Sequence, residues 1–219
     1  MIIYMAEQGR YLSPAESLRH DATRMRSLYV NLTNRCPCSC TFCLRTMKDM
    51  RDDMTLWLQQ EPSVEEVKEA LDGAPWPVIN EVVFCGFGEP TERLETVVML
   101  LRHIREAYPA VKTRINTNGL SDLLYGRNTA KDFAGGLLDT ISISLNEYSA
   151  ERYLAVTRSR FGLDSYDAML TFAEHCKAYI PQVVMTVVDQ VESPAAIEKC
   201  RQICSQRGLT LRVRRYEGN

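Results

Sequence analysis

Short runs rich in Val, Ile and Leu alternate along the chain with longer stretches whose apolar residues recur at helical spacing. Strands separated by helices usually run parallel, and right-handed crossovers wind them into an open sheet or a barrel. Because there are too few βα units for a complete eightfold barrel, the pattern predicts an α/β fold, a partial (β/α)6 barrel. The six predicted strands are Leu28–Thr33, Glu81–Cys85, Lys112–Asn116, Thr140–Leu145, Gln182–Val188 and Thr210–Arg214.

The length and composition fit one globular domain. At 219 residues, 45% of them hydrophobic, the chain can bury one core, and we expect an irregular N-terminal extension over residues 1–27 before a core domain over 28–219. No signal peptide and no apolar run near the ~18 residues of a membrane span is present, which predicts a cytoplasmic protein without membrane contact. The net charge of -2 gives no reason to expect general nucleic-acid binding.

Four of the eight cysteines lie between Cys36 and Cys43, just after the first predicted strand. A reducing compartment disfavours disulfides, so we expect metal ligation. The spacing Cys36-x3-Cys40-x2-Cys43 offers three thiolates, which would leave one iron of a [4Fe-4S] cluster open to an amino and a carboxylate group. Structural zinc on all four cysteines is the alternative. Cys38 is either a spare thiol facing away, which we favour, or a fourth ligand.

The CxxxCxxC spacing, with Phe42 before the last cysteine and the loop placed after the first strand, resembles the signature of the radical S-adenosylmethionine (SAM) superfamily. The resemblance implies that Cys36, Cys40 and Cys43 hold a catalytic [4Fe-4S] cluster and that Phe42 lies beside the adenine of SAM. It also implies that the cluster reduces the sulfonium of SAM and that the resulting 5′-deoxyadenosyl radical abstracts hydrogen from a substrate.

A glycine-containing motif, GFGEP, follows the second predicted strand. Glycines at a strand end often only terminate the strand, but they also permit close approach of the backbone to a ligand. The motif resembles the GGE motif of the same superfamily, with Phe87 in place of the first glycine of that motif. The resemblance implies that Phe87, Gly88 and Glu89 hold the methionine amino group of SAM.

The later strands also end in candidate residues, where the functional loops of parallel sheets belong. Asn118-Gly119 could form only a turn, and core packing explains Val188 equally well. The resemblance nevertheless implies that Asn116, Asn118, Ser144 and Asn146 lie near SAM. Val188 is a further candidate, because it could flank the adenine.

Cationic residues flank the predicted site. Arg45, with Lys48 and Arg51, follows the cysteines, whereas Arg214 and Arg215 end the last predicted strand, in which Arg212 shares a face with Arg214. Solvated surface charge is the ordinary explanation. At the mouth of a barrel, however, Arg45, Arg214 and Arg215 could clamp a carboxylate or a phosphate of the substrate.

Three functions remain open from the sequence: a radical SAM enzyme acting on a small molecule, an activase that installs a glycyl radical on a partner protein, and a non-enzymatic metal-binding module. The first two imply a flavodoxin or ferredoxin as electron donor and loss of activity in oxygen. An open barrel could also be closed by a second copy of the chain, which would make a homodimer. Within the superfamily, MIIY and NLTNRCPCSC resemble the small TatD-associated proteins.

Overall fold

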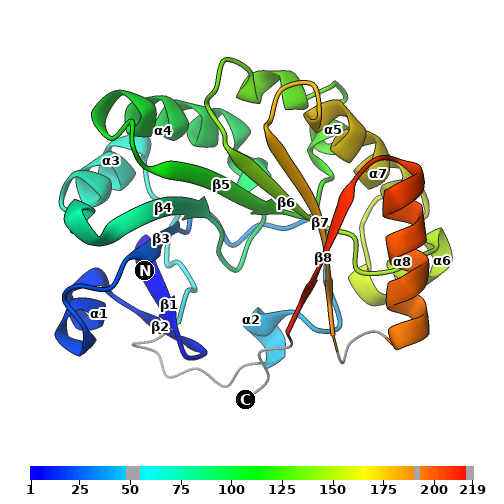
Figure 1. Ribbon diagram of the computed structural model, residues 1–219, viewed down its shortest axis with the longest axis horizontal. Helices are drawn as coiled ribbons and strands as arrows, with labels where there is room; N and C mark the ends of the chain where they lie inside the picture. Colours follow the sequence, from blue (N-terminus) through cyan, green and yellow to red (C-terminus); the bar gives the residue numbers. More distant parts are fainter. Residues whose placement is uncertain (48–54, 190–192, 216–219) are drawn as a thin grey trace.

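The computed structural model describes residues 1–47, 55–189 and 193–215 of the chain. It contains a curved eight-stranded sheet in the order β2-β1-β3-β4-β5-β6-β7-β8 (Figure 1). Strands β3 to β8 run parallel, with helical segments between consecutive strands, so the predicted α/β fold is confirmed. The parallel strands are β3 Arg26–Val30, β4 Ile79–Phe84, β5 Lys112–Thr117, β6 Thr140–Ser144, β7 Gln182–Val188 and β8 Thr210–Arg214.

The N-terminal segment is not irregular, and that expectation was wrong. Strands β1 (Ile3–Glu7) and β2 (Arg10–Leu12) form a hairpin whose two turn residues, Gln8 and Gly9, have φ of 50° and 75°. Two successive positive φ angles match the right-handed twist of adjoining strands. Strand β1 then pairs antiparallel with β3, so the hairpin extends the sheet that carries the site.

Several of the helices begin at capping residues. Ser63 and Glu66 form a capping box at the start of α3, and Ser193 caps α8, which has Pro194 in its first turn. The α-helices are α1 Pro14–His20, α2 Leu44–Met47, α3 Val64–Asp72, α4 Leu94–Ala107, α5 Ser121–Tyr125, α6 Ala150–Thr157, α7 Asp164–Cys176 and α8 Pro194–Gln206. Short 3-10 helices span Trp76–Val78, Pro90–Arg93 and Ala130–Phe133.

The two faces of the parallel strands differ in polarity because successive side chains point to opposite faces. Leu28, Val82 and Ile115 are fully buried in the core that also contains residues of α4 and α7. Arg114 and Asn116, which alternate with Ile115, are only half-buried on the opposite face. Figure 1 shows α3, α4, α7 and α8 on the convex side of the sheet, which leaves the concave face for polar residues.

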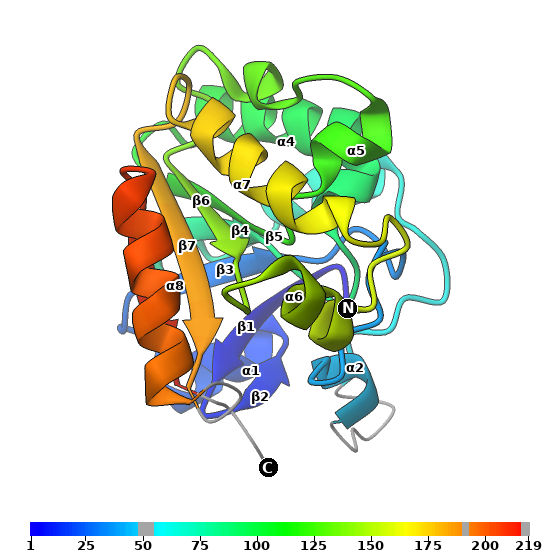
Figure 2. The same cartoon turned by 90° about the vertical axis from the view of Figure 1, so that its right-hand side faces the viewer.

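Helices α7 and α8 complete the outer layer. Helix α7 packs against β6 and β7 (Figure 2), and α8 packs along β8 (Figure 1). No helix within the described ranges combines the length and the apolar character needed to cross a membrane.

Candidate functional site

The clustered cysteines lie in the loop between β3 and α2. The C-terminal end of α6 holds this loop through backbone hydrogen bonds. The Ser39 N–H donates to the Thr157 carbonyl and the Thr41 N–H donates to the Val156 carbonyl, each at 2.9 Å. Helix α6, which is distant in the sequence, therefore fixes the backbone of the loop that carries the cysteines.

The Cys38 thiol lies between two of the predicted ligands. It contacts the thiols of Cys36 and Cys40, and only 2% of the residue is exposed. The side-chain nitrogen of Asn118 lies 3.8 Å from the Cys36 sulfur and 4.0 Å from the Cys38 sulfur. Cys38 thus does not face away, and that expectation was wrong: the two-residue steps between these cysteines bring the three thiols to one side of the loop.

The thiols differ in acidity. Hydrogen bonding from the Cys38 thiol lowers the pKa of Cys36 and of Cys40, and it outweighs the opposing effect of burial. The pKa of Cys38 is raised because its neighbours hold it in the protonated form, and burial raises the pKa of Cys43. Because the thiolate is the metal-binding form, the lowered pKa values of Cys36 and Cys40 suit the ligand role predicted for them.

The donor set consists of thiols. Among the described residues, no three His, Cys, Asp or Glu side chains are grouped so that they could hold one metal ion. In a cluster each thiolate binds a different iron, and the sulfurs need not converge on one point. Cys36, Cys40 and Cys43 carry thiols, the soft type of ligand that such clusters take.

The glycines of GFGEP pack against the strand and loop that lead to the cysteines. A Cβ added to Gly86 would lie 2.0 Å from the Asn31 side-chain oxygen, and one added to Gly88 would lie 2.3 Å from the Thr33 carbonyl oxygen. The next residue, Glu89, donates its N–H to the Arg35 carbonyl at 2.8 Å. These glycines were expected to let the backbone approach a ligand. In the structure they let the segment after β4 pack directly against the segment that precedes the cysteines.

The Glu89 carboxylate joins the ends of β4 and β5. It accepts hydrogen bonds from the Thr117 hydroxyl and from the Asn118 N–H, both at 2.7 Å, and from Thr91. Burial raises the pKa of Glu89, although these hydrogen bonds work in the opposite direction. One oxygen, Oε2, accepts a bond only from Asn118 among the described residues, which leaves it capacity for a ligand ammonium group.

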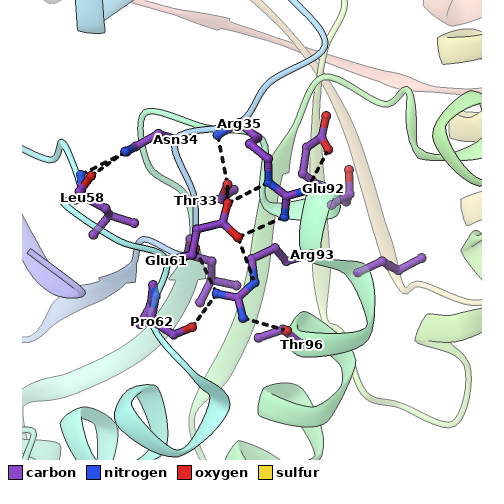
Figure 3. Close-up of polar contacts among 12 residues, drawn as sticks. Thr33, Asn34, Arg35, Leu58, Glu61, Pro62, Glu92, Arg93 and Thr96 are labelled. Atoms are coloured by element: carbon purple, nitrogen blue, oxygen red, sulfur yellow. Dashed lines mark hydrogen bonds and ion pairs between the residues drawn. The ribbon is translucent and has the colours of Figure 1, made fainter.

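A network of ionic contacts fixes the start of the cysteine loop (Figure 3). Arg35 donates to Glu61 at 2.7 Å, the Thr33 hydroxyl donates to the same carboxylate, and Arg93 lies 3.8 Å from it. Burial acts to raise the pKa of Glu61, but the bonds from Arg35 and Thr33 outweigh it and lower the pKa. Arg93 also donates to the Pro62 carbonyl at 2.6 Å, so the segment after residue 54 is tied to the loop.

A cavity of about 270 Å³ opens beside the cysteines at the C-terminal ends of the strands. Its walls come from the cysteine loop, from α2 and from the ends of β6, β7 and β8. It gathers nine of the predicted residues, namely Cys40, Phe42, Cys43, Arg45, Phe87, Ser144, Val188, Arg214 and Arg215. A larger cavity of about 460 Å³ at the opposite end of β7 and β8 contains none of them.

The other predicted residues lie outside the cavity wall. They are Cys36, Gly88, Glu89, Asn116, Asn118 and Asn146. Asn116 contacts the Cys85 thiol, and its side-chain oxygen is buried without a partner among the described residues. Asn146 has a φ of 60°, a conformation that asparagine tolerates better than most residues. Lys48 and Arg51 lie outside the described residues.

Six residues that were not predicted as site residues also line the cavity, namely Tyr4, Tyr11, Leu44, Leu56, Cys85 and Gly86. Tyr4 and Tyr11 come from the hairpin of β1 and β2. Tyr4 stacks on Tyr29 with ring centroids 5.0 Å apart and donates its hydroxyl to the Cys85 carbonyl at 3.2 Å. The apolar run before Gln8-Gly9 indicates a strand, but it does not specify that this strand pairs with β3 beside the cysteine loop.

Comparison with known proteins identifies relatives and structures with the same fold. A GTP 3′,8-cyclase of Corynebacterium glutamicum (strain R) is 33% identical over 215 residues, which cover 92% of this chain and 53% of the cyclase. The chain thus spans about half the length of this relative. Among solved structures, Streptococcus suis SuiB bound to SAM has a TM-score of 0.64 at 19% identity and covers 94% of this chain and 43% of SuiB.

SuiB bound to its precursor peptide SuiA gives a TM-score of 0.66 at 18% identity, over 93% of this chain and 42% of SuiB. These structures establish the likeness of fold. The sequence comparison goes further, because the model of the radical SAM superfamily matches residues 30–202, from the end of β3 into α8. The matched range contains the cysteine loop, GFGEP and the ends of β5, β6 and β7. This chain belongs to the radical SAM superfamily, whose enzymes use a [4Fe-4S] cluster and SAM.

Proposed function

We propose that this chain reductively cleaves SAM at a [4Fe-4S] cluster on Cys36, Cys40 and Cys43 and uses the 5′-deoxyadenosyl radical to abstract hydrogen from a substrate. One observation carries the proposal: Cys40 and Cys43 open onto the same cavity as Phe42. A ligand in that cavity would touch both the thiol-bearing loop and the ends of β6 and β7.

The residues around the cavity suit the parts of SAM. Phe42 and Val188 offer apolar surface for the adenine, and the Ser144 hydroxyl offers a hydrogen bond to the ribose or the carboxylate. Glu89, which lies outside the wall of that cavity, would accept the methionine ammonium group through Oε2, beside Asn118. Phe87 and Leu56 are both buried, so they limit the access of water to this end of the cavity.

The substrate and the partners follow from chemistry and from the relatives. Of the two enzymatic alternatives we favour a small-molecule substrate, because the relatives at 33% identity are GTP 3′,8-cyclases, which are named for a nucleotide.

We assign electron delivery to a flavodoxin or ferredoxin and expect a reducing, cytoplasmic setting, since the site depends on free thiols. We also propose a homodimer, in which a second copy of the chain covers the open side of the sheet.

The test is SAM cleavage by the whole protein, reconstituted with iron and sulfide without oxygen and reduced with dithionite. We expect the wild type to form 5′-deoxyadenosine and Cys40→Ala to form none, because that variant loses a cluster ligand. Cys176→Ala is the matched control: it also removes one thiol, but from the core of α7. Equal product from Cys40→Ala and Cys176→Ala would refute the cluster assignment.

A further inference from the structure

Three arginines lie on the concave face of the sheet, beyond the cluster loop. Arg114 is on β5, whereas Arg212 and Arg214 are on β8. Strand alternation puts Arg212 and Arg214 on one side of β8, with Leu211 and Val213 on the other. We refer to Arg114, Arg212 and Arg214 as the arginine surface.

Contacts across the sheet fix the direction of these side chains. An Arg212 side-chain nitrogen lies 3.4 Å from the Ser142 hydroxyl, although β7 separates their strands, so Arg212 reaches over the concave face. Arg114 points to the same face, where it binds the Glu81 carboxylate at 2.8 Å. Partial burial, and then the positive charges of Arg114 and Arg214, lower the pKa of Arg212. The three guanidinium groups therefore influence one another electrostatically.

The arginine surface lacks sufficient counter-charge. Glu81 pairs with Arg114, but no ion pair joins Arg212 or Arg214 to a carboxylate among the described residues. Only 14% of the Arg114 side chain is exposed, whereas Arg212 and Arg214 are open to solvent. A ligand can thus reach the positive charges of Arg212 and Arg214. The third charge, on Arg114, is already paired with Glu81. Ser142 adds a neutral hydroxyl at the same place.

We propose that the arginine surface binds a phosphate group of the substrate. A phosphate monoester carries about -1.5 to -2 charges at pH 7, which matches the two arginines without a carboxylate partner. The planar guanidinium group binds two oxygens of one phosphate at once. This inference rests on the proposed function for its reaction, but the binding site exists independently of SAM cleavage.

The location links the phosphate to the chemistry. Arg214 lines the cavity that Cys40 and Ser144 also line, and Arg212 precedes it by two residues on the same strand face. A phosphate on this surface would hold one end of a substrate away from the cluster and direct its other end into the cavity. The enzyme would thereby select phosphorylated molecules and orient the hydrogen that is removed.

The experiment measures binding of inorganic phosphate to the full chain by calorimetry, in a phosphate-free buffer without SAM or reductant. We expect the wild type to bind phosphate at least tenfold more tightly than acetate. Arg212→Gln should weaken phosphate binding about tenfold or more, since a hydrogen bond to a charged group is lost. Arg212→Lys should restore part of the affinity, and Glu81→Gln should increase it severalfold by removing a competing carboxylate.

Arg201→Gln is the matched control, because it removes an arginine from the exposed side of α8, where it pairs with Glu198. It should bind phosphate as the wild type does. The proposal is overturned if phosphate binds no better than acetate, or if Arg212→Gln and Arg201→Gln bind equally while both keep the wild-type melting temperature. A wild type that binds phosphate but forms no 5′-deoxyadenosine would refute only the proposed function.

Discussion

Gly88 shows how a single residue couples the second motif of the site to the first. The space that a side chain would need is occupied by two carbonyl oxygens of the cysteine-loop segment, those of Thr33 and Arg35, at 2.3 Å and 2.6 Å from the position that a Cβ would take. These oxygens belong to backbone and have no freedom to rotate away. Any residue larger than glycine must therefore shift the loop that carries the cysteines.

We expect Gly88→Ala to destabilise the protein by about 1–3 kcal/mol, the usual cost of forcing a methyl group into a packed region. Gly73→Ala is the matched control, because its Cβ would meet only ordinary contacts, the nearest at 3.6 Å. Urea unfolding of the two variants measures the difference. Equal unfolding midpoints would contradict the close packing of β4 against the cysteine loop.

At the scale of elements, the sequence predicted the parallel strands well because their apolar runs are buried by helices that are also visible in the sequence. The first strand illustrates the limit. Residues Asn31 to Thr33 continue the buried run of β3, yet β3 ends at Val30. The Asn31 side chain bonds the Leu56 carbonyl at 2.6 Å, and Gly88 approaches Thr33, so contacts with distant segments end the strand.

Another contact between elements lies at the start of β6, where Asp139 joins this strand to α4 and β5. Its carboxylate accepts the Thr113 N–H at 2.8 Å and pairs with Arg105. Burial acts to raise the pKa of Asp139, but these two bonds and Lys112 outweigh it and hold the pKa below its ordinary value of 3.8. A carboxyl with a lowered folded-state pKa stabilises the protein above its unfolded pKa, and this stabilisation disappears as the pH falls through the folded value.

Asp139→Asn should therefore lower the free energy of unfolding by roughly 1.5–3 kcal/mol at neutral pH, the value of hydrogen bonds to a charged group. The difference from the wild type should shrink as the pH falls below about 4, where the carboxyl of the unfolded chain takes up its proton, and further as the pH falls through the lowered folded pKa. Urea unfolding across this range measures it, with exposed Glu106→Gln of α4 as control. A difference that stays constant from neutral to acidic pH would contradict the ionic role of Asp139.

At the scale of the whole molecule, the site is assembled from segments distant in the sequence. The cysteine spacing and the motifs at the strand ends predicted most of the cavity wall, because those residues follow strands that had been identified. Tyr4 and Tyr11 could not be placed, because their position depends on the pairing of β1 with β3, which strand periodicity does not specify. The contact of Cys38 with Cys36 and Cys40 likewise depends on how α6 holds the loop.

A cluster held by three cysteines would have one iron without a protein ligand, and this open coordination position can be tested. If Cys36, Cys40 and Cys43 are the only protein ligands, SAM should bind the fourth iron directly. The most direct measurement is electron paramagnetic resonance of the anaerobically reconstituted, reduced protein before and after addition of SAM. We predict about four irons per chain and a cluster signal that shifts with SAM, in the wild type and in Cys176→Ala, and loss of that signal in Cys40→Ala. A cluster signal that SAM leaves unchanged would contradict the account.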